Sequence, residues 1–279
     1  MPEKQLNHFI PRFMLNYWGK KNEQDRFGVH VYDIERSKFF FSDGTGKKAY
    51  SFAIEKNGYV PIIDEERRTN LEDWFSGLEG TLAKAIRQFN AEEISMFDDV
   101  KEYQRFLLSV LSFKYRTQAF VNHVTEFLKE SIGVREDLDP AKSLEVIVLE
   151  NIVNATTDDV NTYNFCDFEI LHTQDDDSFI LGDRPFVSDL FDEWSLLILS
   201  NKLVVMLRKN HRHEPRFRFV PAKKDFVHSV NMLIAEQAHY WIVGASEQHL
   251  GLYLNEADQK SNIPISYVPP KNLSSGYYF

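Results

Sequence analysis

The most basic segment of the chain, residues 208–219, carries side chains that could contact phosphate. Its arginines are Arg208, Arg212, Arg216 and Arg218. Phe217 and Phe219 are interleaved with them, and cations that alternate with aromatic rings are typical of surfaces that bind nucleic acid. A surface hairpin that faces acidic neighbours explains the same residues. The pattern therefore allows contact with nucleic acid without requiring it.

Two pairs of residues have spacings that a metal ion could use, His211 with His213 and Glu236 with His239. The first pair would point to one side of an extended strand, where Glu214 or Asp225 could add a carboxylate. We favour a solvated turn for that pair. The second pair lacks the matching pair from another helix that such sites use. The sequence therefore predicts no metal site.

Short motifs that accompany common cofactors and nucleophiles are missing. The chain contains no G-x-S-x-G, H-E-x-x-H or G-x-G-x-x-G. Residues 43–48 contain glycine and lysine without the spacing of a phosphate-binding loop. The aspartate clusters at 158–159 and 175–177 do not fit a calcium loop, and we interpret them as solvated turns. We expect no cofactor.

Composition sets further bounds on the class of protein. Of the 279 residues, 43% are hydrophobic, enough to bury a sizeable core. The formal net charge of −10 opposes generic binding to phosphate backbones, although a local basic groove is compatible with it. Cys166 is the one cysteine, which excludes a disulfide framework. Neither a signal peptide nor an apolar run of about 20 residues is seen, so we expect a cytoplasmic protein without membrane contact.

The amino-terminal part of the chain is predicted to contain a short helix and a hairpin. Residues 11–18 are apolar, with a proline suited to the first helical turn and a glycine just after the last. Residues 27–33 and 37–42 alternate in polarity around a short turn, which is typical of a β-hairpin.

The middle of the chain has helical periodicity. One helix begins at Asn70, and a long helix capped by Asp98 or Asp99 runs to about Ser131. A third helix is expected from about residue 140 to residue 154 or beyond.

The carboxy-terminal part returns to strands. Residues 168–172 and 178–181 flank an acidic turn and are predicted to form a hairpin. Residues 193–200 and 202–208 are continuously apolar, which indicates central strands buried on both faces. A helix is expected over 223–243, and the tail from Leu250 is expected to be irregular.

The order of these elements predicts an α+β fold with one domain over residues 1–279. Residues 1–65 contribute the short helix and hairpin, 66–165 form a helical insertion, and 166–279 contribute strands, a helix and the tail. The amino-terminal and carboxy-terminal strands are expected to form a mixed or antiparallel sheet around the helical middle section.

An ordered set of short motifs resembles the bacterial family called domain of unknown function 4238. The motifs are His8-Phe-Ile-Pro11, Phe13-Met-Leu15, Val29-His-Val-Tyr-Asp33, Leu78-Glu79, Thr81-Leu-Ala83, Tyr115-Arg116-Thr117, Ile180-Leu-Gly-Asp183-Arg-Pro185 and Val230-Asn231. Their order and approximate spacing match over nearly the whole chain. The chain departs from the family pattern at Gln118-Ala119, where a proline is usual, and at Gly182, where a serine is usual.

The resemblance marks five polar residues and carries no activity with it. They are His8, Glu79, Arg116, Asp183 and Asn231. His8 could act as general acid or base, Asp183 could orient the imidazole, and Arg116 could hold a phosphate or carboxylate. Glu79 and Asn231 would support them. The alternative is a buried polar network, because buried charges need partners whatever the function.

Two functions remain open from the sequence. The first is an interaction or binding module for an unknown protein partner, in which the five polar residues are architectural. The alternative is a phosphodiester hydrolase, a nuclease-like effector that uses His8, Arg116 and Asp183 and needs no metal. Contact with nucleic acid through the basic hairpin would fit the second more closely.

Overall fold

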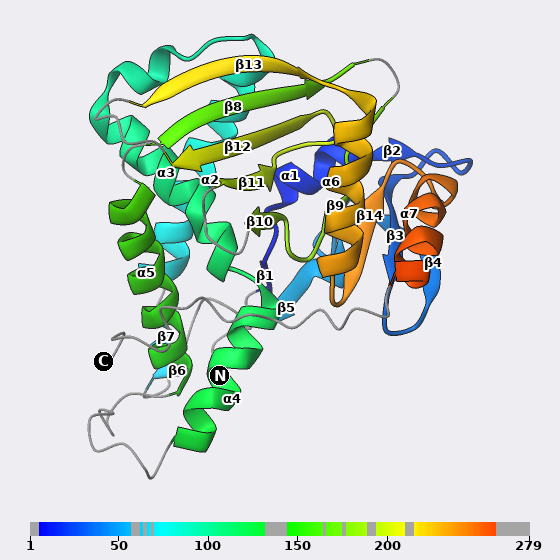
Figure 1. Ribbon diagram of the computed structural model, residues 1–279. Coiled ribbons are helices and arrows are strands. Elements are labelled where there is room, and N and C mark those ends of the chain that lie inside the picture. The colour runs from blue at the N-terminus through cyan, green and yellow to red at the C-terminus, as the bar shows by residue number, and fades with distance from the viewer. Residues whose placement is uncertain are drawn as a thin grey trace.

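The computed structural model in Figure 1 describes residues 6–56, 62–63, 66–67, 70–131, 144–163, 166–174, 177–188, 194–209 and 215–260. Within these residues, helices pack against two five-stranded sheets, so the predicted α+β class is confirmed. The expected single sheet is instead two. Among the described helices, none has the length and apolar character needed to cross a membrane.

One of the two five-stranded sheets has more residues in its strands and is called the larger sheet. It is built entirely from the carboxy-terminal part of the chain. In spatial order its strands are β10 (Phe186–Ser188), β11 (Trp194–Ile198), β12 (Leu203–Lys209), β8 (Cys166–Thr173) and β13 (Arg216–Ala222). All neighbours are antiparallel except β8 and β13, which makes the sheet mixed. The two apolar runs predicted as buried strands form β11 and β12, which pair with each other, and both strands are largely buried.

The hairpin predicted between residues 168–172 and 178–181 is wrong. Strand β8 pairs with β12 and β13, whereas Leu181–Gly182 forms β9 in the other sheet. The reason is that the backbone of Ser178 and Ile180 bonds to the side chain of Asn231, which takes up the groups that a hairpin ladder would have used.

The smaller sheet joins the two ends of the chain. It contains β2 (Lys20–Lys21), β3 (Phe27–Asp33), β4 (Lys38–Asp43), β14 (Trp241–Gly244) and β9. The predicted hairpin of β3 with β4 is confirmed. The helix predicted over 223–243 stops early, because α6 covers Lys224–Gln237 and residues 241–244 form a fully buried strand between β3 and β9.

Short elements complete the ends of the chain. They are β1 (Leu6–His8) paired with β5 (Ile54–Lys56), β6 (Ile62–Ile63) paired with β7 (Glu66–Arg67), α1 (Arg12–Leu15), and 3-10 turns at Asn16–Trp18, Ser51–Ala53 and Ser95–Asp98. The predicted helix over 11–18 is therefore present. The prediction of an irregular tail from Leu250 is wrong for the residues up to Lys260, since α7 covers Glu247–Lys260. Residues 261–279 lie outside the described residues.

The helical middle section contains α2 (Asn70–Asn90), α3 (Val100–Tyr115), α4 (Gln118–Ser131) and α5 (Leu144–Tyr163). The predicted helix from Asp99 to Ser131 is in fact two helices that break at Arg116 and Thr117. Arg116 has left the helical conformation (φ −83°, ψ 55°), and the Thr117 hydroxyl accepts a bond from the Phe120 amide at 3.2 Å. The break sends α4 away from the sheets, toward the lower end of the molecule in Figure 1.

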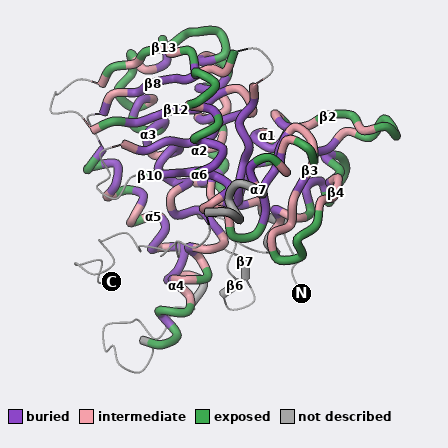
Figure 2. Tube along the Cα trace, turned by 45° about the vertical axis from the view of Figure 1, so that its right-hand side comes forward, coloured by how far each residue is buried: buried purple, intermediate pink, exposed green. Residues whose placement is uncertain are grey.

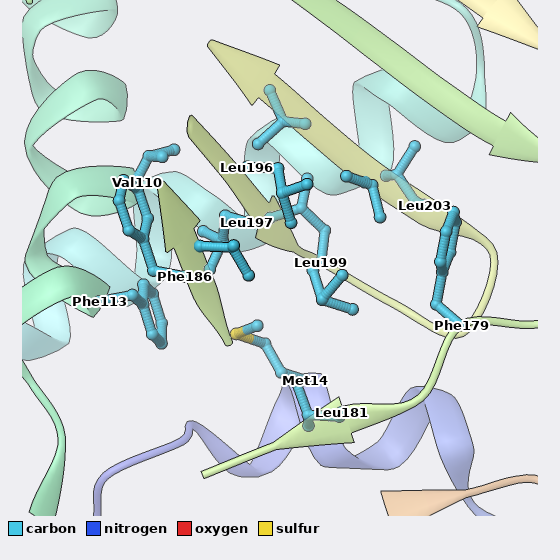
Figure 3. Close-up of a cluster of buried hydrophobic side chains, with 14 of the residues drawn as sticks. Met14, Val110, Phe113, Phe179, Leu181, Phe186, Leu196, Leu197, Leu199 and Leu203 are labelled. Carbon is cyan, nitrogen blue, oxygen red and sulfur yellow. The ribbon is translucent and has the colours of Figure 1, made fainter. Parts of the chain in front are cut away.

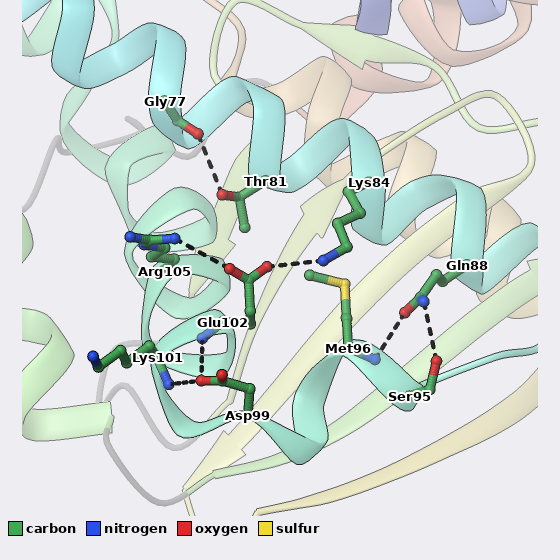
Figure 4. Close-up of polar contacts among 10 residues, drawn as sticks. All are labelled: Gly77, Thr81, Lys84, Gln88, Ser95, Met96, Asp99, Lys101, Glu102 and Arg105. Carbon is green, nitrogen blue, oxygen red and sulfur yellow. Dashed lines mark hydrogen bonds and ion pairs between the residues drawn. The ribbon is translucent and has the colours of Figure 1, made fainter.

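The start of α3 is fixed by side-chain hydrogen bonds. The Asp99 carboxylate accepts bonds from the amides of Lys101 at 2.7 Å and Glu102 at 3.4 Å, which confirms the predicted cap. Glu102 then contacts Lys84 of α2 and Arg105 of its own helix, as Figure 4 shows. These bonds tie α2 to α3 along their exposed sides.

The main core lies where both sheets meet the helices. Side chains from α1, α3, β9, β10 and β11 point toward one another in Figure 3. A second cluster of buried side chains joins α2, α4 and α5 below the first. Figure 2 shows that α4 is buried mainly along one side, with exposed residues on the other. The Arg116 guanidinium contacts Phe113 of the first cluster and Phe75 of the second.

Candidate functional site

Arg116 is the centre of the predicted constellation. Its side chain is 3% exposed, and its guanidinium donates to the backbone carbonyl of His8 at 3.1 Å and forms an ion pair with the Glu79 carboxylate. The guanidinium carbon also lies 4.6 Å from the ring centroid of Phe75 and 5.7 Å from that of Phe113. One side chain thus joins β1, α2 and the end of α3, as a planar, multidentate cation can.

The His8 imidazole lies within electrostatic reach of this ion pair. Its Nε2 donates to the Ala49 carbonyl at 3.0 Å. Burial lowers the pKa of His8 below its ordinary value of 6.5, the Ala49 bond and Glu79 raise it, and Arg12 and Arg116 lower it. The neutral ring with its proton on Nε2 is therefore the favoured form, and that proton is held by a backbone carbonyl.

Asp183 lies in a different set of contacts. Its Oδ1 accepts bonds from the amides of His239 at 2.9 Å and Tyr240 at 3.2 Å, and its own amide donates to the Trp241 carbonyl at 3.2 Å. Within the described residues no hydrogen bond joins it to His8. Burial raises the pKa of Asp183, and its Oδ2 has no hydrogen-bond partner in the described part of the chain. Asp183 thus fixes the turn that leads from α6 into β14.

Asn231 is fully buried on α6 and uses both ends of its amide. Its Oδ1 accepts from the Ile180 amide at 2.9 Å, and its Nδ2 donates to the Ser178 carbonyl at 3.0 Å. Asn231 therefore bridges α6 to the segment that precedes Asp183.

The five marked residues therefore form two groupings. His8, Glu79 and Arg116 meet where β1, α2 and the end of α3 come together. Asp183 and Asn231 each hold a segment beside α6 through backbone bonds. The sequence predicted one constellation, and these contacts do not make Asp183 the orienting carboxylate of His8.

The basic segment is partly neutralised. Arg208 of β12 and Arg218 of β13 both contact Glu169, a 5% exposed residue of β8, with the Arg208 contact at 3.4 Å. Arg216 is exposed. Arg212 and the predicted histidine pair at 211 and 213 lie outside the described residues. Glu169 was not predicted as a partner of these arginines. A carboxylate within the apolar run of β8 nevertheless indicates that cations lie beside it, because a buried charge needs a partner.

The aromatic residues of the same segment are not on its cationic face. The Phe217 ring stacks on Phe168 with centroids 4.7 Å apart and on Phe97 with centroids 4.3 Å apart. Phe219 contacts the ring of Phe89 from α2 edge-on. Because strand side chains alternate, the arginines face one side and the phenylalanines face the helices.

One aspartate cluster was misinterpreted. Asp159 is not in a solvated turn but inside α5, 4% exposed, where it accepts a bond from the Tyr115 hydroxyl at 2.7 Å and pairs with Lys114 at 3.0 Å. The apolar stripe of α5 continues past Asn154 to Tyr163, and that periodicity was the missed signal. Residues 175 and 176 of the other cluster lie outside the described residues.

Metal-ligand geometry is not found among the described residues. No group of three or more histidine, cysteine, aspartate or glutamate side chains in that part of the chain could hold an ion. The Nε2 atom of His239 accepts from Arg184 at 3.1 Å. The pair of Glu236 with His239 is accordingly not arranged around a shared ion.

A comparison with family models matches residues 7–248 to the family described as protein of unknown function (DUF4238). The chain belongs to this family. The match covers most of the 279 residues and includes every landmark from which the resemblance to DUF4238 was inferred. Comparisons with curated proteins and with solved structures gave no match.

Proposed function

We propose that the protein is a binding module and that its marked polar residues hold the fold together. The observation that carries this proposal is the environment of Arg116. Its guanidinium is engaged by the Glu79 carboxylate and the His8 carbonyl while lying over the Phe75 ring. A clamp for phosphate needs donors aimed at the substrate, whereas Nη2 of Arg116 donates to groups of the chain itself.

The surroundings of His8 support the same conclusion. A general base needs an imidazole nitrogen within hydrogen-bond reach of its substrate and a partner that orients the ring. The Nε2 proton of His8 is bound to the Ala49 carbonyl, and Asp183 bonds to the amides of His239 and Tyr240. The carboxylate that the hydrolase alternative assigns to His8 is therefore engaged by backbone amides elsewhere.

The experiment compares folding with phosphodiester cleavage in the full chain. Wild type, His8→Ala and Arg116→Ala are incubated with RNA, with single- and double-stranded DNA, and with bis(p-nitrophenyl) phosphate, each with and without Mg²⁺. Their thermal unfolding is measured in parallel. We expect no cleavage by any of the three, and unfolding temperatures that fall in both variants.

A different result would replace the proposal with the hydrolase. That result is cleavage by wild type that is lost in His8→Ala while the unfolding temperature stays unchanged. Arg105→Ala is the matched control, because Arg105 is largely exposed and pairs only at the surface with Glu102 among the residues that Figure 4 draws.

A further inference from the structure

Strand β13 lies at the edge of the larger sheet, uppermost in Figure 1. Among the described residues it pairs only with β8, in parallel register from Arg216 opposite Asp167 to Ala222 opposite Thr173. An edge strand presents a row of backbone N–H and C=O groups that another extended chain can pair with. Pro221 has no N–H, so the donors of this row end before that residue.

The outer face of this edge is cationic. Arg216 and Arg218 are exposed on β13, and Arg208 of β12 faces the same side because it stands opposite Asp167. Arg208 and Arg218 share Glu169. Arg216 forms no ion pair with any described residue. Among the described residues of these strands, the three arginines on this face outnumber its two carboxylates, Asp167 and Glu169.

We propose that β13 binds an extended acidic segment of a partner protein, which adds to the sheet as a strand and places its carboxylates against Arg216 and Arg218. This inference rests on the proposed function, since it names the partner of the binding module. Backbone pairing supplies the affinity, and the charged face selects which extended segments fit.

Nucleic acid fits the same surface less well. Single strands bind by stacking bases on exposed aromatic rings, but the Phe217 ring is stacked between Phe97 and Phe168.

A second copy of this chain also fits poorly. Two β13 edges that paired with each other would bring Arg216 and Arg218 of both copies onto one face. Like charges on neighbouring strands destabilise the pairing, which is how natural edge strands avoid self-association.

The test uses the full chain and three labelled peptides of 7 residues, the length of β13. The first alternates glutamate with valine, the second has lysine in place of glutamate, and the third is the first with proline at its centre. Binding is measured by fluorescence anisotropy at low and high salt. We expect the first peptide to bind, to bind more weakly at high salt, and to exceed both others.

Two substitutions locate the binding surface. Arg216→Glu should weaken binding of the acidic peptide by about fivefold to tenfold, because an attraction becomes a repulsion at the edge of the interface. Arg26→Glu is the matched control, since Arg26 is exposed on the loop before β3 and undergoes the same change of charge. Glu169→Gln removes the competing carboxylate but keeps an acceptor, so it should tighten binding.

Hydrogen exchange identifies the binding mode. Peptide addition should slow exchange of backbone amides in residues 216–220 and leave α4 unchanged. Equal binding of the proline peptide would overturn strand addition, and equal binding by Arg216→Glu and wild type would overturn this location. Tighter binding of a single-stranded oligonucleotide than of the acidic peptide would make the surface a nucleic-acid site.

Failure of this inference is distinguishable from failure of the proposed function. If no peptide binds, the proposal that β13 binds an acidic segment is overturned. The unfolding and cleavage measurements on the His8 and Arg116 variants still test the proposed function independently. Cleavage of phosphodiesters that depends on His8 overturns the binding-module proposal whether or not the peptide binds.

Discussion

The guanidinium of Arg116 donates to the backbone carbonyl of His8, 108 residues earlier in the chain, at 3.1 Å. That bond connects the first strand to the point where α3 ends and α4 begins. Because the same guanidinium pairs with Glu79, a single buried cation fixes three segments that have no local sequence relationship.

Arg116→Ala is expected to destabilise the protein by about 2–4 kcal/mol, since it leaves the buried face of Glu79 and the His8 carbonyl without their donor. Arg116→Lys should recover only part of the loss, because an ammonium keeps the charge but lacks the planar guanidinium that lies over the Phe75 ring. Urea unfolding followed by far-UV circular dichroism measures both. Unfolding midpoints equal to that of wild type would show that Arg116 does not join these segments.

Asn231→Ala should cost about 2–4 kcal/mol, because it strands the Ile180 amide and the Ser178 carbonyl in the interior. Asn231→Asp is the sharper variant, since its ionised carboxylate would face the Ser178 carbonyl with no proton to donate. Its stability should therefore rise relative to wild type as the pH falls and the new carboxyl protonates.

The measurement is urea unfolding at neutral and at mildly acidic pH. Ser229→Ala on the exposed side of α6 serves as the control, because its hydroxyl bonds only to the Asp225 carbonyl among the described residues. Identical pH profiles for Asn231→Asp and wild type would contradict the assigned direction of the Nδ2 bond.

The lowered pKa of His8 makes stability depend on pH. The folded protein binds the His8 proton less tightly than the unfolded chain, in which the pKa is about 6.5, so stability rises with pH in this window. The contribution is fully present above pH 6.5 and is lost as the pH falls toward the folded pKa. His172 and His249, whose pKa values are also lowered by burial, act in the same direction.

His8→Gln isolates this contribution. The glutamine amide can donate to the Ala49 carbonyl at every pH, so the variant should lose less stability than wild type between pH 7 and pH 5. Thermal unfolding in a series of buffers measures the two slopes. A steeper slope in His8→Gln than in wild type would mean that the folded protein binds the His8 proton more tightly.

Two glycines should respond to alanine in opposite ways. A Cβ at Gly77, inside α2, meets no atom within 4 Å, so Gly77→Ala should stabilise the protein by about 0.5–1 kcal/mol through helix propensity. A Cβ at Gly28 would lie 2.1 Å from the Ser42 carbonyl oxygen, which β3–β4 pairing holds in place.

Gly28→Ala is therefore expected to lower the unfolding temperature by several degrees, as strain in a buried ladder requires. Differential scanning calorimetry of both variants provides the measurement. If Gly28→Ala were as stable as wild type, β3 and β4 could not approach as closely as described.

Local patterns of the sequence were sufficient for several elements. The alternation of residues 27–42 predicted the β3–β4 hairpin, and the apolar runs on either side of Asn201 predicted the buried strands β11 and β12. Asp99 was correctly predicted as a helix cap. Each of these features depends on residues close together in the chain. There the periodicity of apolar side chains and the residue preferences of turns and helix caps determine the local structure.

The candidate site was predicted only in part. The ordered motifs marked five polar residues, of which His8, Glu79 and Arg116 lie together. The position of Asp183 could not be inferred from the sequence. Its partners are the backbone amides of the turn between α6 and β14, and these amides come close to Asp183 only in the folded protein.

The sequence by itself determined the α+β class, the main helical stretches and the family to which the chain belongs. Tertiary structure decided where the long helix breaks at Arg116, which strands flank β8 and why residues 241–244 form a strand. The physical reason is that an apolar run can be buried in either a helix or a strand. Contacts with segments a hundred residues away determine which state satisfies its backbone groups.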